Sequence, residues 1–125
     1  MCEMYTPKWV FSDLGTFDLD VCAPKGGVLW IPAMFYYTEE DDGLSSPWFG
    51  RVWCNPPFSD AKRWMEKFMK HGNGVALVPV SKSLWFDQLL ANQNARIEIL
   101  PSTLKFVTPN GDLKAIRSPC CLVRL

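Results

Sequence analysis

The sequence predicts an α/β domain with a mostly parallel sheet, and two observations indicate that fold class. Short segments with the composition of strands alternate along the chain with segments of helical periodicity. One strand candidate, 74–80 ("GVALVPV"), is apolar throughout, which is typical of a parallel strand buried on both faces. The chain has 125 residues, of which 48% are hydrophobic, so we expect one domain over 1–125 with its own core.

The first half of the chain predicts one short helix and two strands. The helix is delimited by Thr6-Pro7 at its start and by Gly15 at its end. The first strand alternates apolar and polar side chains, whereas the later aromatic segment is interrupted by prolines and glycines. We therefore expect a helix at 6–15, a strand at 16–23 and a turn at 24–27. A loop at 28–50 and a strand at 51–54 follow.

The second half begins with the clearest helix of the chain, at 59–72. Gly72 ends it, and its apolar stripe with helical spacing consists of Ala61, Trp64, Met65, Phe68 and Met69. A turn-rich segment with Pro109-Asn110-Gly111, rather than a helix, leads to the last strand, which we therefore expect to be antiparallel. The remaining expected elements are a strand at 74–80, a helix at 83–94, a strand at 96–100 and the last strand at 120–125.

Composition excludes several classes of protein. No apolar run approaches the length of a membrane span, and the first residues do not resemble a signal peptide. The five cysteines are odd in number and include no CxxC pair, so we expect neither a disulfide framework nor a metal site. A reducing cytoplasm fits this pattern best.

Charge is divided between the two halves of the chain. Residues 1–60 carry three basic and nine acidic side chains, a balance of −6, whereas residues 61–125 carry ten and four, a balance of +6. The whole chain is neutral, so a basic side rather than the entire molecule is available for an anionic partner.

The stretch "VWCNPPF" (52–58) stops an apolar strand at an asparagine, two prolines and an aromatic ring. In an open α/β sheet, ligands lie beyond the carboxyl ends of the strands, which is where this stretch falls. Asn55 offers an acceptor, Pro56 offers a backbone carbonyl, and Phe58 offers a flat face. Pro57 keeps the turn rigid. Together they predict a slot for a planar group that carries an amine.

This slot suits methyl transfer to an exocyclic amine. The lone pair of an aromatic amine is delocalised into its ring, so the amine is a poor nucleophile. Two acceptors aimed at its hydrogens favour a tetrahedral nitrogen and stabilise the positive charge that develops during attack on a methyl sulfonium. The rest of the rate acceleration comes from holding the methyl donor and the amine in line, and no side chain has to act as a strong general base.

At this point the chain resembles a known family. "VWCNPPFSD" resembles the (Asn/Asp/Ser)-Pro-Pro-aromatic motif of amino-methyltransferases, and "YTPKWVFSDL", "FDLDVCA" and "FYYTEEDDGL" are similar to segments of the phage-type DNA N-6-adenine methyltransferases. The similarity continues through "ALVPV", "LKFVTPNG" and "SPCCLVRL", and so covers nearly the whole chain. It implies a minimal Rossmann-like methyltransferase sheet with helices on both faces, and a phage or restriction-modification setting.

The resemblance also implies roles for individual residues. Residues 55–58 match the catalytic turn that binds adenine. The expected ligands of the cofactor, S-adenosylmethionine, are Thr6 and Pro7 at its methionine end, Asp20 with Cys22 and Ala23 beside it, and Asp42 at its adenine amine. The chain has no Gly-x-Gly after the first strand, but this cofactor has no phosphate for such a loop to bind.

The expected substrate is adenine in double-stranded DNA, flipped into the Phe58 slot. Lys62, Arg63, Lys67 and Lys70 on the helix after the slot are the expected phosphate contacts, with Lys82, Lys105 and Lys114 as further candidates. Aromatic residues of the segment 28–50, such as Trp30 and Tyr37, are candidates for sequence preference because no separate recognition domain is visible. Two alternatives stay open: methylation of cytosine N4 or of a protein glutamine, and a catalytically silent DNA- or cofactor-binding relic.

Overall fold

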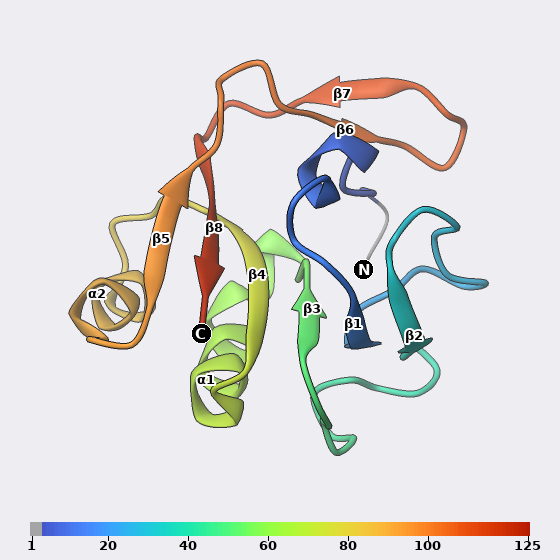
Figure 1. The fold of residues 1–125 in the computed structure, drawn as a ribbon. Helices are drawn as coiled ribbons and strands as arrows, with labels where there is room; N and C mark the ends of the chain where they lie inside the picture. Colours follow the sequence, from blue (N-terminus) through green and yellow to red (C-terminus); the bar gives the residue numbers. More distant parts are fainter. Residues whose placement is uncertain (1–3) are drawn as a thin grey trace.

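A computed structural model describes residues 4–125 and shows a six-stranded sheet in the order β2-β1-β3-β4-β8-β5 (Figure 1). The strands β2, β1, β3 and β4 are parallel, and β8 lies antiparallel between β4 and β5. The sequence prediction of a mostly parallel sheet with an antiparallel last strand is therefore confirmed. The strands are β1 (Phe17–Asp20), β2 (Ala33–Tyr36), β3 (Val52–Cys54), β4 (Gly74–Pro79), β5 (Arg96–Ile99) and β8 (Cys120–Arg124).

One face of the sheet is covered by the two α-helices, α1 (Ala61–His71) and α2 (Leu84–Ala91). The helix α1 buries four of the five residues of the stripe predicted from its spacing and partly buries the fifth, Met69, and Gly72 ends the helix in the left-handed conformation with φ of 74°. Its core side chains pack on alternate residues of β1, β3, β4 and β8, because every second side chain of a strand points to the same face. Neither helix of residues 4–125 is long and apolar enough to cross a membrane.

The other face is covered by the short 3₁₀ helix η1 (Lys8–Phe11) and by the segment 100–106. Within this layer the Trp53 ring of β3 packs against Phe11 at 4.6 Å and Phe17 at 5.7 Å between centroids. The helix expected over 6–15 is thus a single 3₁₀ turn. Helices do lie on both faces, but only one face carries α-helices.

The strand β2 lies inside the segment 28–50 that the sequence analysis interprets as a loop, so that part of the interpretation is wrong. Three of its four side chains are exposed, because β2 is the edge strand and no further layer covers it. An edge strand of this kind shows neither the alternation nor the continuous apolar run that identifies strands in a sequence. The strand β2 forms because its backbone pairs with that of β1.

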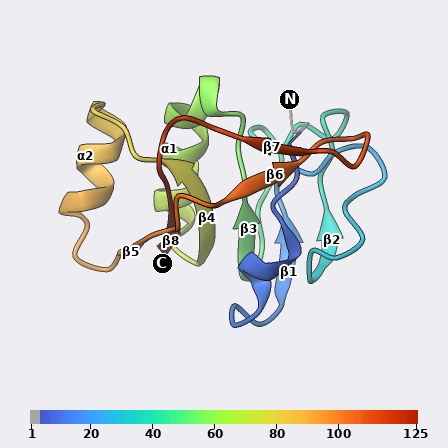
Figure 2. The same cartoon turned by 90° about the horizontal axis from the view of Figure 1, so that it is seen from above.

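A two-stranded hairpin, β6 (Lys105–Val107) and β7 (Leu113–Ala115), stands outside the main sheet. The segment that carries it leaves and re-enters the sheet at the carboxyl end of β4, since Pro79 pairs with Cys120. Seen from above, the hairpin extends across the sheet toward the start of the chain (Figure 2). A backbone bridge between Tyr5 and Val107 fixes it there.

Candidate active site

The turn at 55–58 begins where β3 ends, at the carboxyl edge of the parallel strands. The Asn55 side chain donates from Nδ2 to the backbone carbonyl of Met4 at 3.1 Å. Because this contact uses the amide nitrogen, Oδ1 is the end of the side chain that is left to accept. The acceptor expected at this position is therefore oriented by the first described residue of the chain.

The remaining residues of the turn give it a rigid frame. Pro56 is buried, and Pro57 precedes the short 3₁₀ helix η2 (Phe58–Asp60), which leads into α1. The Phe58 ring is half-buried and meets Phe106 of β6 edge to face, with the ring centroids 6.0 Å apart. The hairpin thus supports the aromatic ring of the turn.

A narrow cavity connects this turn with the start of the chain and the end of β1, and Asn55, Thr6, Asp20, Cys22 and Trp53 are among its lining residues. The side chains of Thr6 and Trp53 are 0% exposed, yet Thr6 Oγ1 and Trp53 Nε1 have no hydrogen-bond partner within residues 4–125. Buried polar groups are nearly always paired, and this cavity has a volume of about 10 Å³, so the two orphans mark a small polar space that holds about one water molecule as it stands. Four of these residues, Asn55, Thr6, Asp20 and Cys22, are expected from the sequence, whereas Trp53 is not.

Two other expected residues lie outside this cavity. Pro7 is buried and precedes η1 as its N-cap. Ala23 is buried, and its backbone N–H donates to the carbonyl of Tyr37 at 2.8 Å. Both residues shape the backbone around the cavity, but neither of their side chains is part of its lining.

Asp20 is the buried acidic group of the site, with 3% exposure. Its Oδ1 accepts a hydrogen bond from the backbone N–H of Cys22 at 3.2 Å. Desolvation by burial raises the pKa of Asp20 from 3.8 to about 7, although the hydrogen bond from Cys22 opposes the shift. Near neutral pH a cation placed in the cavity therefore favours the ionised carboxylate.

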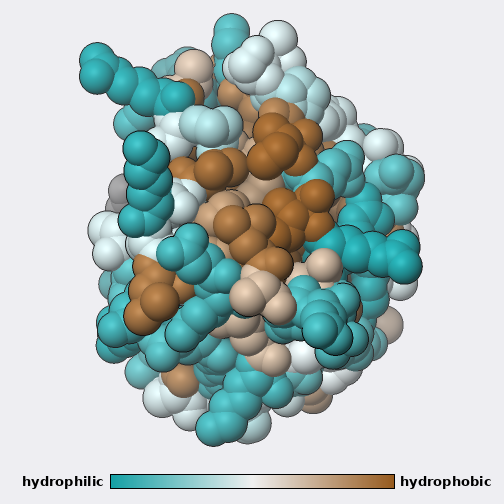
Figure 3. Space-filling model, turned by 90° about the vertical axis from the view of Figure 1, so that its left-hand side faces the viewer, coloured by the Kyte–Doolittle hydropathy of each residue, from teal (hydrophilic) through white to brown (hydrophobic). Residues whose placement is uncertain are grey.

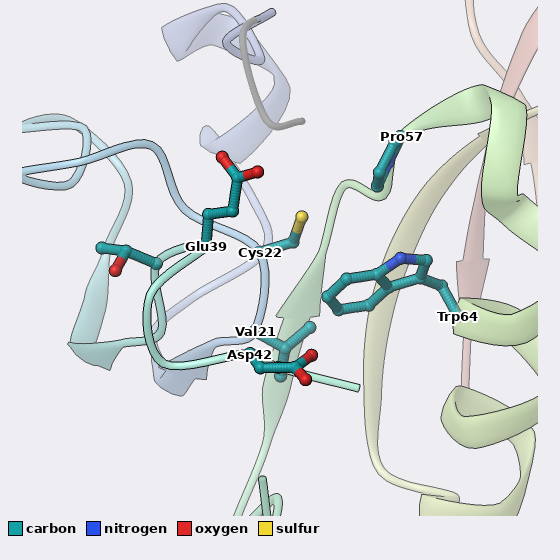
Figure 4. A pocket seen from close by; sticks show the side chains of 8 residues that line it. Val21, Cys22, Glu39, Asp42, Pro57 and Trp64 are labelled. Atoms are coloured by element: carbon teal, nitrogen blue, oxygen red, sulfur yellow. The ribbon is translucent and has the colours of Figure 1, made fainter. Parts of the chain in front are cut away.

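A second cavity lies on the other side of Cys22, which lines both cavities. Asp42 and Glu39 are on one side, and Pro57 and the Trp64 ring of α1 lie across from them (Figure 4). Its volume is about 90 Å³. The cavity thus combines acidic acceptors with an apolar, partly aromatic wall, and the Pro-Pro turn connects it to Asn55.

Glu39 is a candidate that the sequence analysis misses, because it treats the run 39–42 as a loop and selects only Asp42. The signal was present in the spacing. Glu39 follows Asp20 by 19 positions and comes soon after β2. In nucleotide-binding α/β folds, an acidic residue about 20 positions beyond the first strand accepts hydrogen bonds from a ribose.

The loop that carries Asp42 is fixed to α1 by Lys67. Its Nζ donates to the backbone carbonyls of Gly43 at 3.0 Å, Leu44 at 2.9 Å and Ser46 at 2.5 Å. Burial lowers the pKa of Lys67. Gly43 itself lies so close to Val21, the residue after β1, that an added Cβ would be 2.1 Å from its carbonyl oxygen. Lys67 therefore holds the cavity wall, which differs from the phosphate contact expected of it.

The other three basic residues expected to contact DNA are exposed on α1. Arg63 forms an ion pair with Asp60 at 2.5 Å, so part of its charge is compensated. No ion pair or hydrogen bond involves the side chain of Lys62 or Lys70 within the described residues 4–125. Of the expected set, Lys62 and Lys70 are thus the most available to an anionic partner.

The parallel strands with an antiparallel β8, and an Asn-Pro-Pro-Phe turn open to a cavity at the carboxyl end of β3, define the class: a Rossmann-like methyltransferase fold. Within that class, residues 3–120 match the family model of the DNA N-6-adenine-methyltransferases (Dam), and the chain belongs to this family. No curated protein and no solved structure matches the chain. Membership makes DNA adenine methylation the general activity.

Proposed function

We propose that this protein transfers the methyl group of S-adenosylmethionine to the exocyclic N6 amine of adenine in double-stranded DNA. The observation that carries the proposal is the shared cavity: the oriented Asn55 acceptor, the orphan groups of Thr6 and Trp53, and the buried Asp20 all line it. The family model supports DNA adenine as the substrate class.

The polar groups that line this cavity match the chemistry of the methionine end of the cofactor, which would lie at its opening. Its carboxylate needs hydrogen-bond donors, and Thr6 Oγ1 and Trp53 Nε1 are two buried donors without a partner in the described chain. Its ammonium needs an acceptor with negative charge, which Asp20 provides when ionised. When bound, the cofactor supplies an electrophilic methyl group.

The second cavity fits the adenosine end. Glu39 is placed to accept from the ribose hydroxyls, and Asp42 to accept from the adenine amine. One oxygen of Asp42, Oδ2, already accepts from Ser45 Oγ at 2.7 Å, which orients the carboxylate. Pro57 and Trp64 offer an apolar wall for the adenine ring.

The catalytic turn acts on the target amine. Asn55 Oδ1 and the Pro56 carbonyl accept its two hydrogens and stabilise the positive charge that grows on nitrogen. Phe58 provides the face against which the target ring lies, and the hairpin supports it through Phe106. The proton is released from the methylated amine after transfer, and no strong base is required.

The position of the catalytic turn also determines where DNA has to bind. The target base must leave the duplex to reach the turn. Lys62 and Lys70, with Arg63 beside them, lie on the exposed side of the helix that follows the turn, where they are placed to contact phosphates. A DNA substrate also implies that the protein works in the cytoplasm of a bacterial or phage-infected cell, in a phage or restriction-modification setting.

The test is methyl transfer from tritium-labelled S-adenosylmethionine to adenine-containing DNA, followed by digestion and chromatography of the nucleosides. We expect the label in N6-methyladenine. Label in N4-methylcytosine or in a protein glutamine would identify one of the alternative amine substrates. No label in any product, together with binding of S-adenosylhomocysteine or DNA, would identify a catalytically silent protein and overturn the proposal.

A further inference from the structure

Among the described residues, the two cavities of the candidate site are lined by three acidic side chains and by no lysine, arginine or histidine. Asp20 lines the narrow cavity, whereas Glu39 and Asp42 line the second one. Charges of one sign within walls of low dielectric constant focus their electric field into the space that they enclose. We therefore expect a negative potential inside both cavities.

This negative charge is local, because the whole chain carries 13 basic and 13 acidic side chains. The face over α2 and β5, at the opposite edge of the sheet from β2, instead presents an apolar patch that includes Leu84, Leu90 and Ile99 (Figure 3). The ammonium of Lys67 is bound to three carbonyls of the loop behind Asp42, and Lys67 belongs to neither lining. The lining thus has no basic counterpart within it.

The two cavities meet at Cys22, which lines both, and acidic groups lie on each side of it. Asp20 accepts a hydrogen bond from the backbone N–H of Cys22. Burial raises the pKa of the Cys54 thiol well above its ordinary value, and the negative charge of Asp20 adds to the shift, so its field extends as far as the end of β3. No hydrogen bond or ion pair involves the side chain of Glu39 within residues 4–125, and Figure 4 shows Cys22 between Glu39 and Pro57.

We infer that this acidic lining binds the charged cofactor in preference to its product, with Asp20 and Glu39 as the residues that set the preference. This inference rests on the proposed function. The two ends of the cofactor are proposed to lie at the two cavities, so we expect its sulfonium near Cys22. When the methyl group is transferred, the electrons of the S–C bond stay on sulfur, and the sulfonium becomes an uncharged thioether. The negative potential then stabilises the bound product less, and S-adenosylhomocysteine dissociates more readily.

The test compares the dissociation constants of two ligands by titration calorimetry. One is S-adenosylhomocysteine, and the other is sinefungin, which carries an ammonium group in place of the sulfonium and transfers no methyl group. We expect the wild type to bind sinefungin roughly tenfold more tightly. Asp20→Asn should lower this ratio roughly fivefold, and Glu39→Gln roughly threefold, because an exposed charge is more strongly screened. Both ligands share the same methionine and adenosine ends, so the ratio isolates the charge at the sulfur position.

The matched control is Glu40→Gln, since Glu40 is the exposed neighbour of Glu39 and lines neither cavity. This variant should keep the wild-type ratio. Glu39 is also exposed, so Glu39→Gln keeps the test valid if the change at the buried Asp20 disturbs folding. Equal affinities of the wild type for both ligands, an unchanged ratio in Glu39→Gln, or an equal fall in Glu40→Gln would overturn the inference and leave the proposed function intact. A wild type that binds neither ligand and methylates no DNA would overturn both.

Discussion

The side chain of Asn55 donates to the backbone carbonyl of Met4, which lies 51 residues earlier in the chain. This contact orients the carboxamide and brings the segment before η1 against the catalytic turn. The same segment bears Thr6, whose hydroxyl has no hydrogen-bond partner among residues 4–125, so the proposed catalytic and cofactor-binding groups share one support.

Asn55→Ala removes one acceptor aimed at developing positive charge. We expect kcat for DNA methylation to fall roughly 100- to 1000-fold, because loss of one such preorganised group has an effect of this size in other enzymes. Affinity for S-adenosylhomocysteine, measured by titration calorimetry, should change little. Asn94→Ala, at an exposed asparagine, is the control and should leave the rate unchanged. A normal rate for Asn55→Ala contradicts the assignment of the turn.

Thr6→Val keeps the shape of a side chain that is 0% exposed and removes a hydroxyl that has no partner within the described part of the chain, 4–125. The melting temperature of the ligand-free protein should stay the same or rise, since a buried group without a partner disfavours the folded state. The increase in melting temperature caused by S-adenosylhomocysteine should shrink. Thr103→Val, at an exposed threonine, is the control. An undiminished ligand shift for Thr6→Val would mean that the hydroxyl does not bind the cofactor.

The raised pKa of Asp20 makes cofactor binding depend on pH. An ammonium ion binds the ionised carboxylate, and burial places the pKa of Asp20 at about 7. Affinity for S-adenosylhomocysteine should therefore rise with pH through that value, by at most about tenfold per unit below it. Calorimetry across this range should show the rise for the wild type and for Asp87→Asn, an exposed control, but not for Asp20→Asn.

The same pKa gives a trend in stability. The carboxyl of Asp20 titrates near 3.8 when unfolded and near 7 when folded, so between these values the folded state holds the extra proton. The contribution of Asp20 to the free energy of unfolding therefore falls as pH rises through this window. Urea unfolding of Asp20→Asn should lack this part of the pH dependence. An identical slope for wild type and variant contradicts the raised pKa.

Lys67 and Lys70 should behave differently although they lie three positions apart on one helix. Lys67→Met removes the ammonium that binds three carbonyls of the loop behind Asp42, so affinity for S-adenosylhomocysteine should fall roughly tenfold. Lys70→Ala should instead lower the salt dependence of log K for DNA by about one, with unchanged cofactor affinity. Lys67→Arg keeps the charge and should recover part of the cofactor affinity.

Calorimetry measures the affinity of each variant for S-adenosylhomocysteine, and DNA-binding assays at several salt concentrations measure the salt dependence of log K. If Lys67→Met lowers the salt slope as Lys70→Ala does, Lys67 contacts phosphate rather than the loop. That result would restore the role that the sequence analysis expects of it.

The sequence by itself determined the elements that depend on neighbouring residues. The stripe of α1 and the glycine that ends it follow from helical spacing, and the Asn-Pro-Pro-Phe turn follows from prolines that stop a strand. The antiparallel orientation of β8 also follows from local chemistry, because a segment rich in turns replaces the helix that a parallel connection needs. These features require no knowledge of distant contacts.

Only the tertiary structure decided which groups meet. The strand β2 exists through its pairing with β1, and its exposed side chains carry no strand pattern. In the sequence Trp53 resembles any buried core residue, and only its Nε1, which has no hydrogen-bond partner among the residues that the structure describes, makes it a candidate for the site. Lys67 resembles any basic residue on an exposed helix face until the loop that it binds, more than 20 residues away, is in place. Such roles are set by contacts between distant segments, and local patterns do not encode those contacts.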